Sequence, residues 1–271
     1  MPAITRKLHE LQQDKYKKKY EKDLSNASQL QRRLLPEHHL EFHDYELYGA
    51  CIQHGGDSNV GGDYFDYFLN NTHEEDRLGV LISDAASKGL PAAVQSAFVS
   101  GAIKMAQSFS PKISTLLSSI NRLVFDTFPF ERPVSMCYCE LTLSSNRLVL
   151  YANAGHVPQI HFRPSTGEFQ YLYPTGGLLG ILKDQRYVVE NVRMLPGDVL
   201  CLFSDGITEA TDDNGKQFEK ERLKSILKEN CAGNPETIAH KVIEAVEVFA
   251  SSEQYNDDRT IIVIKRHEND K

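Results

Sequence analysis

Four aspartates stand where apolar runs begin or end, a placement typical of residues that do chemistry. Asp63 follows a pair of glycines, and Asp84 and Asp205 each close an apolar run. Asp257 opens another apolar run near the end of the chain. Carboxylates that lie close together raise each other's pKa unless a cation neutralises them. If folding gathers these four side chains, we therefore expect a bound cation.

The types of the surrounding residues favour a hard divalent ion. No cysteine or histidine pattern accompanies the four aspartates, and all-oxygen ligation is typical of Mg²⁺ or Mn²⁺ rather than Zn²⁺. Two such ions that share a bridging carboxylate and a bridging water can activate that water and stabilise in-line displacement at phosphorus. Hydrolysis of a phosphate ester is the predicted chemistry.

Short apolar runs, several of them rich in Val, Ile, Tyr and Phe, predict the strands that position these aspartates. They cover residues 45–52, 64–69, 77–83, 134–143, 147–152, 158–162, 169–173, 187–193, 198–204 and 260–266. Helices are predicted over 90–108, 112–128, 217–229 and 235–250. Runs of antiparallel-looking strands with helices grouped between them predict an α+β layered domain, with sheets inside and helices outside. The four aspartates would then meet at one edge of the sandwich.

A long amphipathic helix is predicted at the N-terminus, where apolar residues recur at spacings of three to five without glycine or an internal proline. We expect this helix to end at Leu35, because Pro36 disfavours helical geometry in the residue before it. Its apolar stripe could pack on the domain that follows, or pair with a second copy of the chain as a short coiled coil and so form a homodimer. The sequence leaves both arrangements open.

Seven short motifs follow one another along the chain. They are Leu34-Leu35-Pro36, Gly61-Gly62-Asp63-Tyr64-Phe65-Asp66, the segment Ser83–Ala93, the segment Tyr151–His156, Leu195-Pro196-Gly197-Asp198, the segment Ser204–Ala210, and Asp257-Asp258-Arg259-Thr260. In this order they resemble the SpoIIE/RsbU branch of the PPM (type 2C-like) metal-dependent serine/threonine protein phosphatases. The resemblance covers residues 27–266. It implies a layered α-β-β-α sandwich with two central, mostly antiparallel sheets, made by a phosphatase domain over 37–267 that follows a linker or regulatory helix over 1–36.

The resemblance implies metal-binding roles for the first two acidic motifs. Asp63 matches the family aspartate that bridges two Mn²⁺ or Mg²⁺ ions, and the turn that ends in Gly62 lets the backbone approach the site. Asp84 matches an aspartate that holds one ion through its side chain or its water shell. The carbonyl of Ala85 matches a backbone ligand.

The late motifs complete the implied site. Asp205 and Asp257 match the two late metal-binding aspartates, so that Asp63, Asp84, Asp205 and Asp257 form the implied catalytic set. Because two acids are adjacent, the sequence leaves Asp258 as the alternative to Asp257. We expect Asp66 to be a strand residue or an outer support rather than a ligand, and His156 to shape a tight turn near the pocket, with substrate contact as its alternative.

Two positions depart from the family pattern. Ser87 stands where a glycine is common, and glycine permits backbone angles that serine adopts only with strain. We therefore expect the loop beside the metals to differ from the family geometry. Glu219 follows Phe218 where Phe-Gly is frequent, and we expect this change to affect a helix entrance at most.

The resemblance also implies a mechanism and a substrate. A metal-bridging hydroxide would attack phosphoserine or phosphothreonine directly, without a covalent intermediate. The substrate would be a small regulatory phosphoprotein of the anti-sigma-factor antagonist (STAS) type, within a partner-switching pathway. The alternative is a catalytically weak, phosphatase-like regulator that binds a phosphoprotein or dimerises without turnover, and a third hypothesis is a domain that binds a divalent ion for structure alone.

Composition narrows the class of protein. The 271 residues carry a formal charge of −7, which argues against a general nucleic-acid binder. No apolar run approaches the ~18 residues of a membrane-spanning helix, and the N-terminus lacks a signal-peptide pattern, so we expect no membrane insertion. The five cysteines lack Cys-x-x-Cys spacing, which favours reduced thiols in a cytoplasmic protein.

Overall fold

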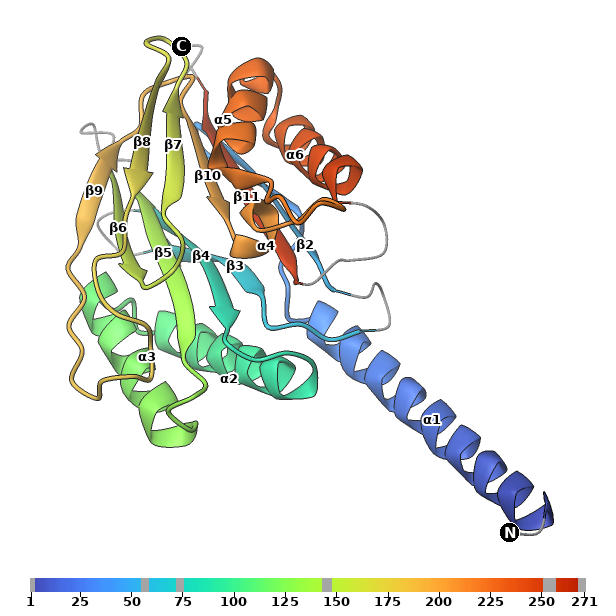
Figure 1. Ribbon diagram of the computed structural model, residues 1–271. Helices are drawn as coiled ribbons and strands as arrows, with labels where there is room; N and C mark the ends of the chain where they lie inside the picture. Colours follow the sequence, from blue (N-terminus) through green and yellow to red (C-terminus); the bar gives the residue numbers. More distant parts are fainter. Residues whose placement is uncertain (1–2, 55–58, 72–75, 143–147, 251–256, 268–271) are drawn as a thin grey trace.

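Two antiparallel sheets packed face to face form the centre of the molecule (Figure 1). The computed structural model describes residues 3–54, 59–71, 76–142, 148–250 and 257–267. Within these ranges the first sheet contains, in spatial order, β1 (His39–Phe42), β2 (Tyr45–Ile52), β11 (Arg259–Arg266), β10 (Val199–Phe203), β7 (Gln159–Arg163) and β8 (Glu168–Leu172). The second sheet contains β3 (Tyr64–Asn71), β4 (Asp76–Ala85), β5 (Val134–Thr142), β6 (Leu148–Ala154) and β9 (Glu190–Arg193).

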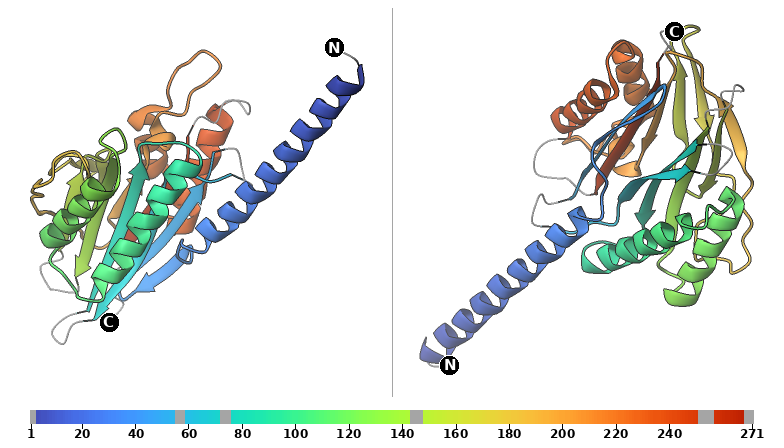
Figure 2. Two further views of the ribbon diagram at one scale, coloured as in Figure 1. Left: turned by 90° about the horizontal axis from the view of Figure 1, so that it is seen from below. Right: turned by 180° about the vertical axis from the view of Figure 1, so that it is seen from behind.

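Helices cover the outer face of each sheet (Figures 1 and 2). Helices α2 (Leu90–Gln107) and α3 (Ile113–Thr127) lie on the second sheet, and α5 (Glu219–Asn230) and α6 (Pro235–Phe249) lie on the first. A single helical turn, α4 (Asp205–Thr208), follows β10 directly. The arrangement confirms the predicted α+β, α-β-β-α sandwich.

The central strands, such as β4, β10 and β11, are buried on both faces, which explains why their sequences are rich in apolar residues. Side chains on successive residues of a strand point to opposite faces. In β4, Leu78, Val80 and Ile82 pack between the two sheets, whereas Leu81 and Ala85 pack against the helical layer. Each strand of this kind therefore contributes to two cores at once, and the two sheets are held as one rigid frame.

The N-terminal helix α1 (Ala3–Arg32) extends away from the sandwich over most of its length (Figures 1 and 2). Tyr16 and Tyr20 are 75% and 59% exposed, so the apolar stripe is uncovered far from the domain. Just beyond its end the chain contacts the domain, where Lys104 of α2 donates a hydrogen bond of 2.8 Å to the carbonyl of Leu34.

The predicted end of this helix at Leu35 was three residues too late. The N–H groups of residues 33–35 bond to carbonyls three residues earlier, which tightens the chain into turns before Pro36. The steric effect of a proline thus reaches further back than the single residue before it. Strand β1 and helix α4 were not predicted, and the strand predicted over 187–193 begins only at Glu190.

No helix in the described ranges is long and apolar enough to cross a membrane. All five cysteines are free thiols, and Cys137, Cys139 and Cys201 are buried inside the strands. Burial raises the pKa of the Cys201 thiol, which keeps it protonated and unreactive at neutral pH.

Candidate active site

The register of the strands brings the four aspartates to one edge of the sandwich. Asp63 immediately precedes β3, and Asp84 is the penultimate residue of β4. These strands pair antiparallel with Tyr64 opposite Ser83, so both acids lie at the same end of the second sheet. In the first sheet Asp205 follows β10 and Asp257 precedes β11, and these strands also pair antiparallel. The ends of two sheets therefore supply the acids from four separate parts of the chain.

The aspartates form one electrostatic cluster. Burial, and then repulsion from Asp84 and Asp258, raises the pKa of Asp63 well above its ordinary value. Burial, followed by Asp205 and Asp257, raises the pKa of Asp84 to about 7. Burial and Asp257 likewise raise the pKa of Asp205. A cluster of carboxylates that oppose each other's ionisation is a strong site for a multivalent cation.

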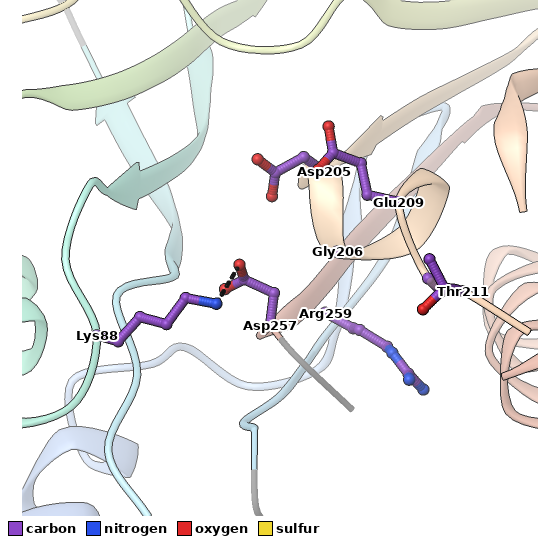
Figure 3. Close-up of a pocket in the computed structure, with 8 residues that line it drawn as sticks. Lys88, Asp205, Gly206, Glu209, Thr211, Asp257 and Arg259 are labelled. Atoms are coloured by element: carbon purple, nitrogen blue, oxygen red, sulfur yellow. Dashed lines mark ion pairs between the residues drawn. The ribbon is translucent and has the colours of Figure 1, made fainter. Parts of the chain in front are cut away.

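The donor set of this cluster fits hard divalent ions, because it consists of carboxylate oxygens with neighbouring backbone carbonyls. Lys88 already places one positive charge here, with its Nζ 3.1 Å from a carboxylate oxygen of Asp257 (Figure 3). No three acidic, histidine or cysteine side chains in the described ranges converge on one point at coordination distance. A bound ion would therefore have to draw these carboxylates closer together.

The loop that carries Asp63 requires glycine for close packing. A Cβ atom on Gly62 would lie 2.9 Å from the carbonyl oxygen of Ala85 and 3.2 Å from Oδ1 of Asp84. The absence of a side chain thus lets the backbone of this loop reach the second acidic motif. On the other side, the Thr260 hydroxyl donates a hydrogen bond of 2.6 Å to Oδ2 of Asp63 and fixes the carboxylate.

The two adjacent late acids lie in different environments. The Asp257 side chain is 48% exposed and lines the same pocket as Asp205. The Asp258 side chain is buried and accepts hydrogen bonds from backbone N–H groups, at 2.8 Å from His54 and 2.7 Å from Gly62. The structure therefore directs Asp257 toward the pocket and uses Asp258 to hold the backbone of the Asp63 loop.

The pocket at this edge has a volume of about 240 Å³ and opens beside α4 (Figure 3). It is lined by Lys88, Asp205, Gly206, Glu209, Ala210, Thr211, Asp257 and Arg259. Gly206 is needed here, because a Cβ atom would lie 2.0 Å from the carbonyl oxygen of Asp258. Thr211 and Arg259 were not predicted to line the site, although the place of Arg259 between Asp258 and Thr260 could have suggested it.

Ser87 does not adopt a left-handed conformation in the loop after Asp84, so this position does not require glycine. The described non-glycine residues with positive φ are His43, Ser110 and Glu219, and the left-handed conformation in this loop falls on Gly89 with φ 68°. The Ser87 N–H donates to the carbonyl of Ala85 at 2.6 Å. Its hydroxyl donates to Oε1 of Gln95 at 3.2 Å. Serine therefore adds a tie between this loop and α2.

His156 shapes a tight turn, with Gly155 before it at φ 64°. Its backbone N–H donates to Oδ1 of Asn153 at 2.8 Å, and its Nδ1 lies 2.6 Å from the Ser135 hydroxyl. Burial lowers the pKa of His156 to about 4. Only 3% of this residue is exposed, and it supports the turn from within the fold.

Asp66 lies on β3, away from the four aspartates. It accepts a hydrogen bond from the Tyr64 hydroxyl, and one of its oxygens lies 3.1 Å from Nζ of Lys104 on α2. The residue therefore ties a strand to a helix, in agreement with its expected place on a strand.

Comparisons with known proteins agree with this geometry. The family of stage II sporulation protein E (SpoIIE) matches residues 74–267. Phosphoserine phosphatase RsbU of Bacillus subtilis (strain 168) is 26% identical over 207 residues, which cover 76% of this chain and 60% of RsbU. The chain thus spans less than two thirds of the length of that relative.

Solved structures share the fold at low sequence identity. The SiaA-PP2C domain of Pseudomonas aeruginosa superposes with a TM-score of 0.75 at 20% identity, covering 93% of this chain and 99% of that one. RsbX in complex with magnesium gives a TM-score of 0.61 at 18% identity, covering 84% and 98%. The family match extends over most of the chain, and the fold and motif order agree with it. The chain therefore belongs to the SpoIIE family.

Proposed function

We propose that this chain is a metal-dependent protein phosphatase that hydrolyses phosphoserine or phosphothreonine on a small regulatory protein. The observation that carries the proposal is the convergence of Asp63, Asp84, Asp205 and Asp257 from both sheets on one edge. Such a concentration of negative charge has no use in a domain that only binds a phosphate group. It suits a site that holds cations against a phosphate ester.

In this proposal the site holds two Mn²⁺ or Mg²⁺ ions, and the four aspartates are their side-chain ligands. Asp63, Asp84, Asp205 and Asp257 would hold the ions together with backbone oxygens near Gly62 and Ala85. Bound ions would supply a water of lowered pKa as nucleophile and neutralise charge on the phosphoryl group. The complex of RsbX with magnesium supports the choice of a hard ion.

Residues around the acids orient them and admit the substrate. The Thr260 hydroxyl holds the Asp63 carboxylate in one rotamer. Asp258 holds the backbone of the same loop. Lys88 and Arg259 place positive charge on the pocket wall, where a phosphorylated side chain would enter.

We further propose that the substrate is an anti-sigma-factor antagonist of the STAS type and that the protein acts in the cytoplasm. The likeness to RsbU, a phosphoserine phosphatase, supports a partner-switching role. In this arrangement residues 1–36 form a linker that regulates the phosphatase domain over 37–267 and pairs with a second copy through α1. The exposed stripe of α1 supports that pairing.

The proposal is tested by hydrolysis of p-nitrophenyl phosphate, and of a phosphorylated STAS-type protein, with Mn²⁺, with Mg²⁺ and with EDTA. We expect turnover that requires metal and that falls by at least about 100-fold in Asp63→Asn. Asp126→Asn, an exposed acid on α3, serves as the matched control and should retain full activity. Turnover in EDTA, or full activity of Asp63→Asn, contradicts the proposal.

The alternative is a phosphatase-like regulator without turnover, and one observation favours it. The Lys88 amine already neutralises Asp257, so part of the charge cluster is satisfied within the chain. Metal-independent binding of the phosphoprotein by a folded but inactive chain would support this alternative. Lys88→Met distinguishes the two. If the Lys88 amine competes with an ion for Asp257, this variant should bind Mn²⁺ more tightly than the unsubstituted protein.

A further inference from the structure

A glutamine at the end of α1, Gln31, makes two hydrogen bonds to the loop that carries Asp63. Nε2 of Gln31 donates a hydrogen bond of 2.7 Å to the carbonyl of Gly61, and the N–H of Gly61 donates one of 3.1 Å to Oε1 of Gln31. One amide thus satisfies both backbone groups of a residue thirty positions away in the sequence. Gly61 is separated from Asp63 by a single residue.

The loop is held from the opposite side by Asp258. This carboxylate accepts hydrogen bonds from the N–H groups of Gly62 at 2.7 Å and Asp63 at 3.3 Å. A Cβ atom on Gly61 would lie 2.0 Å from Oδ2 of Asp258, so the carboxylate packs directly against the loop. Residues 61–63 are therefore clamped between a helix side chain and a carboxylate that comes from the other end of the chain.

A buried polar network supports the glutamine. Nε2 of Gln53 donates to Oε1 of Gln31 at 2.9 Å, and the Ser28 hydroxyl donates to Oε1 of Gln53 at 3.3 Å. Ser28 is fully buried, and Gln31 and Gln53 are 6% and 8% exposed. Burying amides in this way is costly unless each finds partners, and an apolar side chain on the same helix face would pack at lower cost. A glutamine at this buried position therefore indicates that its hydrogen bonds, and not its burial, are what the fold requires.

We propose that Gln31 is a positioning residue for the proposed metal site. It acts through the Gly61–Asp63 backbone and sets where the Asp63 carboxylate stands. The inference rests on the proposed function for its effect on metal binding, whereas its effect on the loop does not depend on that function. It also makes the last turn of α1 a part of the site, with Gln31 as the contact.

The test compares Gln31→Met with Gln29→Met, which places the same change on the exposed face of the same turn. Loss of an outer support typically weakens metal binding by ~10–100-fold. We expect Gln31→Met to bind Mn²⁺ at least about 10-fold more weakly by calorimetry. The Mn²⁺ concentration for half-maximal activity should rise by the same factor, while kcat at saturating Mn²⁺ changes less. Gln29→Met should match the unsubstituted protein in all three.

Amide hydrogen exchange gives a readout that needs no activity. The N–H groups of Gly62 and Asp63 bond to Asp258 and not to Gln31, so faster exchange there in Gln31→Met would report a loosened loop. Equal exchange and equal Mn²⁺ affinity in the two variants would overturn the inference. If Gln31→Met does not fold, Gln31→Glu replaces it, because a carboxylate keeps the oxygen that accepts from Gly61 and loses the donor.

The two proposals fail in different ways. An unsubstituted chain that neither binds Mn²⁺ nor hydrolyses phosphate ester refutes the proposed function. Exchange at Gly62 and Asp63 still decides whether Gln31 positions the loop. Conversely, a metal-dependent phosphatase in which Gln31→Met behaves like Gln29→Met keeps the function and removes the role of Gln31.

Discussion

Asp84 is a residue at which the acidic cluster opposes folding. Burial, and then Asp205 and Asp257, raises its pKa to about 7, so its ionised form is disfavoured in the metal-free fold. Asp84→Asn should therefore raise the free energy of unfolding in EDTA at pH 8 by on the order of 1–2 kcal/mol. The same change should abolish metal-dependent turnover. Thermal unfolding and p-nitrophenyl phosphate assays check the two effects, and a variant that is less stable in EDTA would contradict the argument.

Asp198, in the Leu-Pro-Gly-Asp motif, has the opposite electrostatic balance. Burial would raise its pKa, but hydrogen bonds from His161 at 2.8 Å, from the Leu195 N–H at 2.9 Å and from Arg163 hold the pKa below its ordinary value. A carboxylate with a lowered folded pKa stabilises the fold above the unfolded pKa of ~3.9, and that stabilisation is lost as the pH falls through the folded pKa. This motif therefore serves the fold and not the site.

From this balance we predict that Asp198→Asn destabilises the protein by about 3 kcal/mol at pH 7, because Arg163 loses its counter-ion and the hydrogen bonds from His161 and the Leu195 N–H lose their charged acceptor. The difference should shrink as the pH falls below the unfolded pKa of ~3.9 and vanish below the lower folded pKa, where the original carboxylate is itself protonated. Urea unfolding at pH 7 and at pH 3 measures both values. Asp126→Asn, which breaks an exposed ion pair with Lys183, should change the stability by less than about 1 kcal/mol.

Which acid faces the pocket could not be predicted from the sequence alone. Asp257 and Asp258 are adjacent and identical in type, and only burial distinguishes them. Gln31 was missed for a related reason, since a glutamine in a charged helix is usually a surface residue. Its place on the apolar stripe, between Ala27 and Leu34, is the one sequence signal that could have identified it.

At the scale of elements, helix α5 begins under backbone strain. Glu219, where Phe-Gly is common in the family, has φ 66°. The left-handed region costs a residue with a Cβ atom about 1 kcal/mol or more, and glycine adopts it freely. Glutamate in place of the common glycine therefore affects the start of α5, as predicted, and the effect is backbone strain at the first residue of the helix.

Glu219→Gly should accordingly stabilise the protein by up to about 1 kcal/mol, less the greater freedom that glycine adds to the unfolded chain. We expect a rise in Tm of about 1–3 °C and unchanged turnover. Lys220→Gly, one residue further into the same helix, is the control and should cost about 1 kcal/mol. A lower Tm for Glu219→Gly would show that the positive φ carries no strain.

Long apolar runs made most elements predictable, because strands buried on both faces cannot contain polar residues without partners. Strand β1 (His39–Phe42) was missed since it is short and carries a charged Glu41, so its pairing with β2 and not its composition makes it a strand. Helix α4 was missed because one turn has no periodicity to detect. These elements depend on neighbours that are distant in the sequence.

At the scale of the whole molecule, α1 is divided into two parts. Its last turn is bound to the domain through Gln31, whereas Tyr16 and Tyr20 lie exposed on the part that extends outward. If the outer part pairs with a second copy, removing residues 1–26 should convert a dimer to a monomer and leave Ser28 and Gln31 in place. Light scattering measures the mass, and an unchanged mass would exclude a coiled coil.

The hydrogen bond between Thr260 and Asp63 joins residues 197 positions apart. During synthesis the ribosome releases the N-terminal aspartates long before β11 exists. A nascent chain can therefore pair β3 with β4, but it cannot fix Asp63 until Asp258 and Thr260 have emerged. A chain that ends before residue 257 therefore lacks Asp257 and both of the residues that hold Asp63 in place, so the acidic cluster cannot assemble in it.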